Sequence, residues 1–372
     1  MANKIIVAAS AVAGLSAAHN PLTGCIVGTQ LRCEGNHCPN WAFDVSRYDT
    51  IMYKDTEQFE YVLNENLPLG PTSERSFNMH SAYSPKTRNY VSVAADYYVD
   101  GVDSYWISTI NDYANESTPV FSNVILAHPD ATPDHPGSIS LQRIVTLSDE
   151  RTIAIFNTGE VHLVDVKGQR YSLLTDISKT AKFAALMTDA HAVDGNVLKS
   201  FIMDANEGIY LVTTDFSGSV PTISEPVLIT MVQGANRETP INALMMSPDD
   251  SVAPRLTLIL HGVFDQINYV DEKTGIQTPI ISNLMDEQVP SIFACYEGTK
   301  DCDFWRNAAY DEENHLLYFQ AHDMSSGTAS TTMLKMGFTV SKVNGEWYPY
   351  INTAMWPMNF GYGGYQYVTI KQ

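Results

Sequence analysis

Residues 79–85 have the sequence MHSAYSP, and related stretches occur at 243–249 (ALMMSPD) and at 308–314 (AAYDEEN). In each of them small and apolar residues lead into a polar turn, and a strong apolar run follows, such as HLLYF at 315–319. The rest of the chain consists of similar short apolar runs separated by Gly, Asn and Asp turns, and helical spacing of apolar residues is nearly absent. The repeated stretch therefore predicts an all-β protein built from strand–turn–strand units.

The apolar runs group in fours, and the group recurs roughly every 45 to 60 residues, which is the period of four-stranded propeller blades. Five such units occupy 76–127, 139–175, 183–229, 242–284 and 304–353. Two fragments remain, at 43–67 and 360–371, and joining them in one sheet would remove two exposed sheet edges. We therefore predict a six-bladed β-propeller over 43–372, closed by pairing of the N- and C-terminal segments. A pair of β-sandwiches is the alternative, since it would also show short strands with regular turns.

The strand–turn–strand pattern of 79–85, 243–249 and 308–314 resembles the innermost strand, turn and second strand of propellers of the YWTD, NHL and gluconolactonase-like classes. This resemblance covers most of 74–353 and implies the architecture only. The Trp-Asp and Gly-His marks of WD40 blades are missing, and the sequence Tyr-Trp-Thr-Asp does not occur.

The composition limits the classes of partner. The chain has 372 residues, of which 44% are hydrophobic, so it can form a substantial core. Its formal net charge of −20 and the lack of any basic run argue against nucleic acid, because phosphate-binding surfaces need clustered Lys and Arg. The acidic balance is compatible with cation binding and equally with solubility alone.

The first 18 residues have the pattern of a secretion signal peptide. Lys4 supplies a positive charge, 5–18 is an apolar run of small residues, and Ser16 and Ala18 fit the positions before a cut at His19. An ordinary buried strand or helix is the alternative. Because the run is shorter than the ~20 apolar residues of a membrane span, we expect a secreted protein with no membrane span.

The cysteines agree with export to an oxidising compartment. Cys25, Cys33 and Cys38 lie in a segment at 19–42 between the signal peptide and the predicted propeller, and two of them are expected to pair. Cys295 and Cys302 are close in sequence and are expected to form a disulfide that closes a small loop. Asn115 begins the sequence Asn-Glu-Ser and is the expected glycosylation site.

A propeller places its ligand site where the loops entering the innermost strands surround one mouth of the central channel. His80 and Asp189 on such strands are the candidate catalytic pair, because a His–Asp pair can act as general base on a water. The candidate binding residues are Arg143, His191, Asn242, Arg306, Asn307 and the aromatic residues Trp305 and Trp356. Structural solvation of a wet channel would explain the polar residues without any chemistry.

Acidic loops are the candidate cation site. His128-Pro129-Asp130 and Asp134-His135-Pro136 place two His and two Asp in one loop, and Asp301 and Asp303 flank Cys302 in another. Asp130, Asp134, Asp301 and Asp303 together could hold Ca²⁺, which takes six to eight oxygen ligands. Asp residues also cap turns without any metal, so the expected cofactor is either none or Ca²⁺.

These observations leave two hypotheses about function. The first is a secreted propeller that binds a small molecule, a lipid headgroup or a glycan at the channel mouth, and it draws on the aromatic content and the lack of any standard catalytic motif. The alternative is an enzyme in the same channel, either a calcium-dependent lactonase or phosphoesterase type of hydrolase, or a lyase or isomerase that uses His and Asp. A purely structural matrix protein is a third possibility.

Overall fold

A computed structural model describes part of the chain. The described residues are 24–32, 42–49, 58–61, 77–84, 86–87, 89–99, 102–111, 120–132, 134, 139–165, 168–178, 186–203, 208–231, 241–246, 256–261, 266–281, 308–311, 316–323, 330–340, 347–351, 356–358 and 362–369. Their secondary structure is almost entirely β, as the repeated strand–turn–strand pattern predicts. No helix among these residues is long and apolar enough to cross a membrane.

Within the described residues the strands form six antiparallel sheets, and most sheets use strands that are consecutive in sequence. The first of these sheets contains β4 (Phe77–Tyr83), β5 (Tyr90–Val99), β6 (Val102–Asn111) and β7 (Val120–Ala127). The second contains β8 (Leu141–Thr146), β9 (Thr152–Phe156), β10 (Glu160–Asp165) and β11 (Arg170–Asp176). The third contains β12 (Leu186–Asp194), β13 (Val197–Met203), β14 (Gly208–Asp215), β15 (Thr222–Ile223) and β16 (Val227–Met231).

The remaining three sheets complete the arrangement. One contains β17 (Ile241–Met246), β18 (Leu256–His261), β19 (Gln266–Val270) and β20 (Gln277–Ile281). The next contains β21 (Ala308–Asp311), β22 (Leu316–Asp323), β23 (Ser330–Val340), β24 (Trp347–Ile351) and β25 (Trp356–Met358). The last joins the two ends of the chain in the order β26 (Tyr362–Thr369), β1 (Gly24–Arg32), β2 (Ala42–Asp49) and β3 (Gln58–Tyr61).

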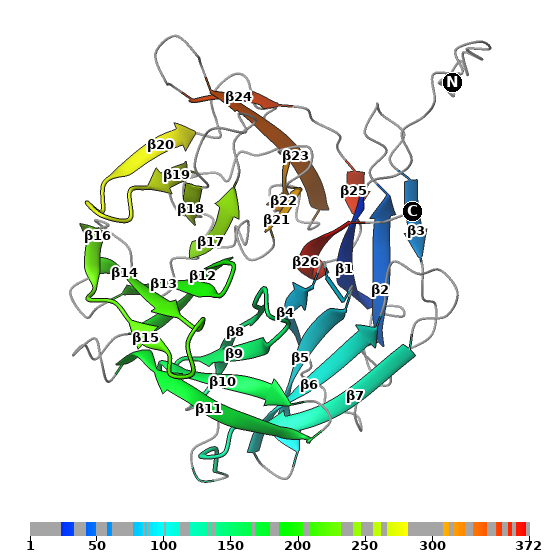
Figure 1. The fold of residues 1–372 in the computed structure, drawn as a ribbon. Coiled ribbons are helices and arrows are strands. Elements are labelled where there is room, and N and C mark those ends of the chain that lie inside the picture. The colour runs from blue at the N-terminus through cyan, green and yellow to red at the C-terminus, as the bar shows by residue number, and fades with distance from the viewer. Residues whose placement is uncertain are drawn as a thin grey trace, which may run out of the picture.

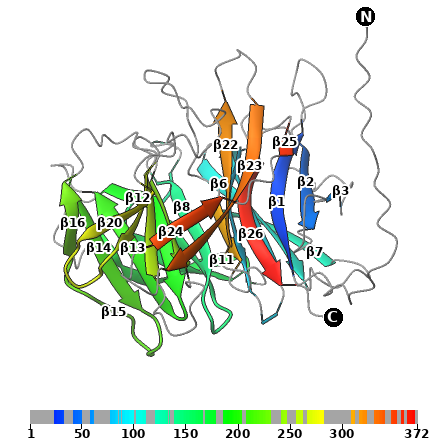
Figure 2. The same ribbon diagram turned by 90° about the horizontal axis from the view of Figure 1, so that it is seen from above.

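The sheets are arranged around a common axis (Figure 1), and the architecture is therefore of the propeller type. The innermost strands, which lie nearest that axis, are β4, β8, β12, β17, β21 and β26. The view from above shows the sheets standing side by side as blades (Figure 2). In the sheet that joins the ends, β26 pairs with β1, and β1 comes from the segment at 19–42 that the sequence analysis left outside the propeller.

Neighbouring sheets pack face to face, and each interface between two sheets is called a seam below. Apolar side chains of β4–β7 pack against those of β8–β11 in a first buried cluster, which includes Val93, Ile107 and Phe156. A second cluster fills the seam between β8–β11 and β12–β16, and a third fills the seam between β12–β16 and β17–β20. The strand alternation explains this packing, because Phe201 points into the third cluster while Ile202 points into the second.

Hydrogen bonds between hairpin turns link three successive sheets. The carboxylate of Glu150, in the β8–β9 turn, accepts hydrogen bonds from the hydroxyls of Ser84 and Thr87, in the β4–β5 turn. Ser148 also lies in the β8–β9 turn, and its hydroxyl donates to the side-chain oxygen of Asn196, in the β12–β13 turn, at 2.8 Å. The polar turns after β4, β8 and β12 therefore also connect one sheet to the next.

Arg151 ties the second sheet to the third. Its Nε lies 2.9 Å from the carboxylate of Asp149, and its Nη2 donates to the backbone carbonyl of Phe216 at 2.6 Å. The hydrogen bonds from Arg151 hold the pKa of Asp149 below its ordinary value. Since the folded-state pKa is lower than the unfolded one, this pair stabilises the fold above pH ~4 and loses its effect as the pH falls through the folded-state pKa.

We predict that Asp149→Asn lowers the free energy of unfolding at pH 7 by at most about 1 kcal/mol, because both side chains are about one-third exposed and water screens them. Urea unfolding of the variant and of the wild type at pH 7 and at pH 2.5 measures the effect. The difference between the two proteins should shrink at pH 2.5, because that pH is below the ordinary pKa of an Asp carboxyl and proton uptake on unfolding offsets the stabilisation by the charged pair. An equal difference at both pH values would contradict a charge-based contribution.

Candidate functional site

Five of the predicted channel residues lie in the innermost strands of their sheets. His80 is in β4, Arg143 is in β8, and both Asp189 and His191 are in β12. Asn242 occupies the corresponding strand β17. These strands are neighbours in space in the order β4, β8, β12, β17 (Figure 1), so β8 lies between the strands that carry His80 and Asp189.

The other predicted site residues lie away from the innermost strands or outside the described residues. Trp356 lies in β25, which pairs with β23, and Asp130 and Asp134 are exposed loop residues. The remaining predictions lie outside the described residues: Trp305, Arg306, Asn307, Asp301, Asp303, Cys295, Cys302 and Asn115.

Arg143 and His191 lie on the facing surfaces of two adjacent sheets. His191 is buried, and its Nδ1 lies 3.0 Å from the hydroxyl of Ser200 on β13. Ser200 lies between Leu198 and Ile202, which point into the seam between β8–β11 and β12–β16, so His191 is directed to the same seam. From the other side, Arg143 shares a face of β8 with Val145, which belongs to that same apolar cluster. The structure thus brings these two predicted binding residues to one seam, beside the channel axis.

We predict that Ser200→Ala lowers the free energy of unfolding by about 1 to 3 kcal/mol, because it removes a hydrogen-bond partner from a buried imidazole. Chemical denaturation followed by circular dichroism measures the change. Ser172→Ala, at a half-buried position of β11, is the matched control and should change the free energy by less than ~0.5 kcal/mol. Equal effects of the two substitutions would show that the His191–Ser200 bond contributes nothing particular.

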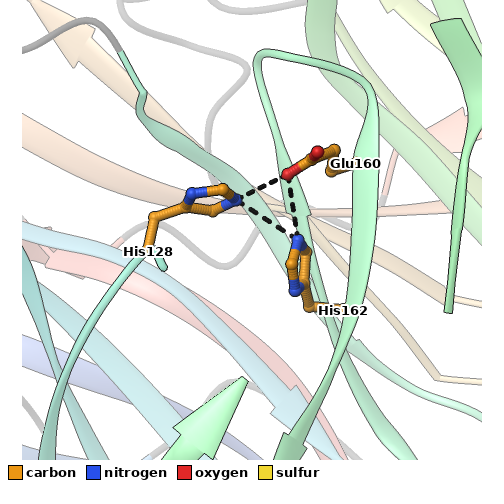
Figure 3. A group of neighbouring side chains, drawn as sticks. All are labelled: His128, Glu160 and His162. Atoms are coloured by element: carbon orange, nitrogen blue, oxygen red, sulfur yellow. Dashed lines mark hydrogen bonds and ion pairs between the residues drawn. The ribbon is translucent and has the colours of Figure 1, made fainter. Parts of the chain in front are cut away.

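A second polar cluster lies in the seam between β4–β7 and β8–β11, and the sequence analysis found only part of it. It consists of His128, Glu160 and His162 (Figure 3). The Nε2 atom of His128 lies 2.7 Å from a carboxylate oxygen of Glu160, and the Nε2 atom of His162 lies 3.1 Å from the same oxygen. The two Nε2 atoms are 3.2 Å apart, so all three side chains point at one another.

Local backbone structure aims these three side chains at one point. His128 directly follows β7, where the chain leaves the outermost strand of its sheet. Glu160 and His162 are two residues apart on β10, so strand alternation puts them on one face. Gly159, which precedes Glu160, has φ = 92°, and an added Cβ would lie 2.8 Å from the Cβ of Ser178. Glycine is thus required at the turn that starts β10.

The cluster is buried among aromatic rings. The side chains of His128 and His162 are 1% and 4% exposed, whereas that of Glu160 is 17% exposed and marks the open side. The ring of Phe156 packs edge-on against both imidazoles, with centroid distances of 4.6 Å to His128 and 5.3 Å to His162. The ring of Tyr171 lies 6.0 Å from that of His162. A carboxylate and two imidazoles therefore meet where little water can solvate them.

The protonation of His128 follows from its contacts. Its Nδ1 accepts a hydrogen bond from the backbone N–H of Asp130 at 3.2 Å, so in the neutral ring the proton is on Nε2 and is donated to Glu160. Burial lowers the pKa of His128, and the nearby His162 lowers it further, while Glu160 and Asp130 act in the opposite direction. Burial therefore favours the neutral form of this imidazole.

Two buried polar atoms near the cluster have no hydrogen-bond partner in the described part of the chain: Nδ1 of His162 and the hydroxyl of Tyr171. Burial also raises the pKa of the Tyr171 hydroxyl, so it stays protonated. Neutral imidazoles and a carboxylate are metal ligands and proton carriers, and these three converge from two different sheets. The group is the one set of three potential ligands found among the described residues.

The sequence pointed to His128 and Asp130 through the loop at 128–136 but not to Glu160 or His162. The signal that could have identified the missing pair is Glu-x-His within an otherwise apolar strand, at 160–162. Two polar residues at i and i+2 lie on one face of a strand, and in a propeller that face packs against the next sheet. Such a pair must be satisfied by a partner across the seam, which here is His128.

Comparisons with known proteins provide no functional assignment. No protein-family model and no curated protein sequence matches this chain. Among solved structures, the periplasmic gluconolactonase of Pseudomonas aeruginosa has 12% identity and a TM-score of 0.45, and the match covers 94% of this chain and 99% of that one. The lignostilbene dioxygenase of Pseudomonas brassicacearum has 8% identity and a TM-score of 0.40, with 94% and 92% coverage. YCF48 bound to D1 peptide has 11% identity and a TM-score of 0.40, with 90% and 83% coverage.

Proposed function

We propose that this chain is an exported six-bladed propeller that binds a small polar molecule or a glycan beside the channel axis, with Arg143 and His191 among the contact residues. The observation that supports the proposal is their placement on facing surfaces of β8 and β12, at the edge of the sheets nearest the axis. An arginine fork and an imidazole together favour a ligand with carboxylate, phosphate or hydroxyl oxygens. A lipid headgroup that carries such groups belongs to the same chemical class.

The closed ring of six blades is part of this proposal. Support comes from the neighbours of the first strands, since β17 lies next to β21, β21 next to β26, and β26 next to β4. The pairing of β26 with β1 adds to it, because a blade shared by the two ends of the chain covers the sheet edges that an open arc would expose. Export is supported by the signal-peptide pattern at 1–18, which lies outside the described residues.

An enzyme in the same channel is the second candidate. His80, Asp189 and Asn242 belong to first strands of three sheets, which is the placement that convergence on one substrate requires. In this role His80 or Asp189 would serve as general base for a hydrolase, lyase or isomerase. Calcium held by Asp130, Asp134, Asp301 and Asp303 belongs to the hydrolase form of this candidate.

We predict that Arg143→Gln weakens binding of a small anionic or hydroxylated ligand at least about tenfold, because it removes a charge-assisted hydrogen-bond donor. A panel of sugars, sugar acids and sugar phosphates, screened by thermal shift and confirmed by calorimetry, identifies the ligand. Arg170→Gln is the matched control, since that side chain is 71% exposed on β11. A ligand that binds Arg143→Gln and the wild type equally well would refute the placement of the site.

We predict that deleting 362–372 destabilises the protein and promotes association, because β1 loses its partner strand and becomes an exposed edge. Differential scanning calorimetry and size-exclusion chromatography of the truncated chain provide the measurements. A truncated chain that stays monomeric and unfolds at the wild-type temperature would contradict the closed ring.

A further inference from the structure

We infer that His128, Glu160 and His162 bind one divalent transition-metal ion, for which zinc is the best fit, in the seam between β4–β7 and β8–β11. This site is separate from the small-molecule site proposed above, which lies in the next seam and near the axis. It is built on three side chains from two sheets, two of which are more than nine-tenths buried.

The distances between the three ligand atoms fit a metal. Bonds of about 2.0 to 2.1 Å to zinc at tetrahedral angles place two ligand atoms about 3.3 Å apart. The Nε2 atoms of His128 and His162 are 3.2 Å apart, and Nε2 of His162 is 3.1 Å from the Glu160 oxygen. The third separation, 2.7 Å between His128 and Glu160, is a hydrogen-bond length and must increase by about 0.5 Å when the ion replaces the proton.

Charge provides an independent reason. The Glu160 carboxylate lies mostly out of water, and its ion-pair and hydrogen-bond partners among the described residues are the two imidazoles alone. Neither partner in the described part of the chain is the fixed cation of a Lys or Arg side chain. A buried carboxylate is costly without a cation or several donors, and a divalent ion at the meeting point of the three atoms provides that cation.

The ligand types select the metal. Two imidazole nitrogens and one carboxylate oxygen suit zinc and its transition-metal neighbours, whereas Ca²⁺ and Mg²⁺ need shells made of oxygen atoms. The His₂Glu set with a vacant fourth position is the pattern of zinc sites that hold a water. The partly exposed side of Glu160 provides access for that water. In this inference the acidic loop contributes to a cation site through His128, and the ion is a borderline transition metal rather than the hard Ca²⁺ ion.

Binding the ion changes the proton position on His128. A neutral imidazole that coordinates through Nε2 carries its proton on Nδ1, which now accepts the backbone N–H of Asp130. Metal binding therefore requires the exposed turn at 129–130 to rotate and present an acceptor. Asp130 already contacts this Nδ1 through its backbone N–H, and we assign its carboxylate as the acceptor after that rotation, so Asp130 is a positioning residue rather than a ligand.

Zinc titration of the purified full-length chain, stripped of metal with a chelator, tests the inference. Competition with a chromophoric chelator gives the affinity, and elemental analysis gives the stoichiometry. We expect about one zinc per chain at this site, a loss of affinity of at least ~100-fold in Glu160→Gln and His162→Gln, and a loss of ~10-fold in Asp130→Asn. Excess Ca²⁺ should not displace the zinc. Cobalt substitution should produce the visible absorption of a four- or five-coordinate Co²⁺ ion.

Glu225→Gln, at an exposed position, is the matched control and should bind zinc as the wild type does. Thermal unfolding with and without zinc checks folding, since the ion should raise the melting temperature of the wild type and the control but not of Glu160→Gln. Glu160→Gln keeps the shape and a hydrogen-bonding oxygen, so it reports on the metal even if the His162 variant does not fold. A wild type without affinity for zinc, or zinc binding that survives in Glu160→Gln and His162→Gln, would overturn the inference. Neither result bears on the small-molecule proposal at Arg143 and His191.

Discussion

Burial of apolar sheet faces against neighbouring sheets is the constraint on which the described part of this structure depends. Each sheet of a propeller has two apolar faces, so it is stable only between two others. The three apolar clusters that fill successive seams show this directly, with Phe156 in the first, Val212 in the second and Met245 in the third. The hydrogen bonds between hairpin turns reinforce the same order of sheets, since Glu150 contacts the previous sheet while Ser148 contacts the next.

This constraint also determines where polar chemistry can occur. A polar side chain on a strand whose sheet lies between two others points into a seam. There it needs a hydrogen-bond or ion-pair partner, which the sheet on the other side of the seam can provide. His128 meets this need for Glu160 and His162. Arg143 and His191 lie on facing surfaces of the next seam, beside the axis, and Ser200 of its own sheet is a partner of His191. Candidate sites in this fold are therefore formed by residues on opposite sides of a seam, which are distant in sequence, and not by one continuous stretch of the chain.

The sequence predicted the fold better than the sites for the same reason. Strand, turn and strand are local features, so the stretch at 79–85 was sufficient to predict β4, the turn after it and β5. The positions of Arg143 and His191 on innermost strands also follow from local order. The pairing of His128 with Glu160 and His162 could not be predicted, because it depends on how two sheets are set against each other across 32 residues of sequence or more. The two ends were expected to share one sheet, but β1 rather than the segment at 43–67 is the direct neighbour of β26.

A comparison of two seams shows what the His128–Glu160–His162 cluster lacks. In the seam between β12–β16 and β17–β20, the buried ammonium of Lys199 contacts the carboxylate of Glu272 directly and lies 3.3 Å from the Thr257 hydroxyl, so an anion there meets a cation from the opposite sheet. Glu160 is less exposed than Glu272, and its ion-pair partners among the described residues are two imidazoles rather than a Lys or Arg side chain. A lysine would have provided a permanent cation at this point, whereas two imidazoles can instead coordinate the divalent ion that we infer. The choice of histidine over lysine at this seam therefore favours a bound metal over a fixed salt bridge.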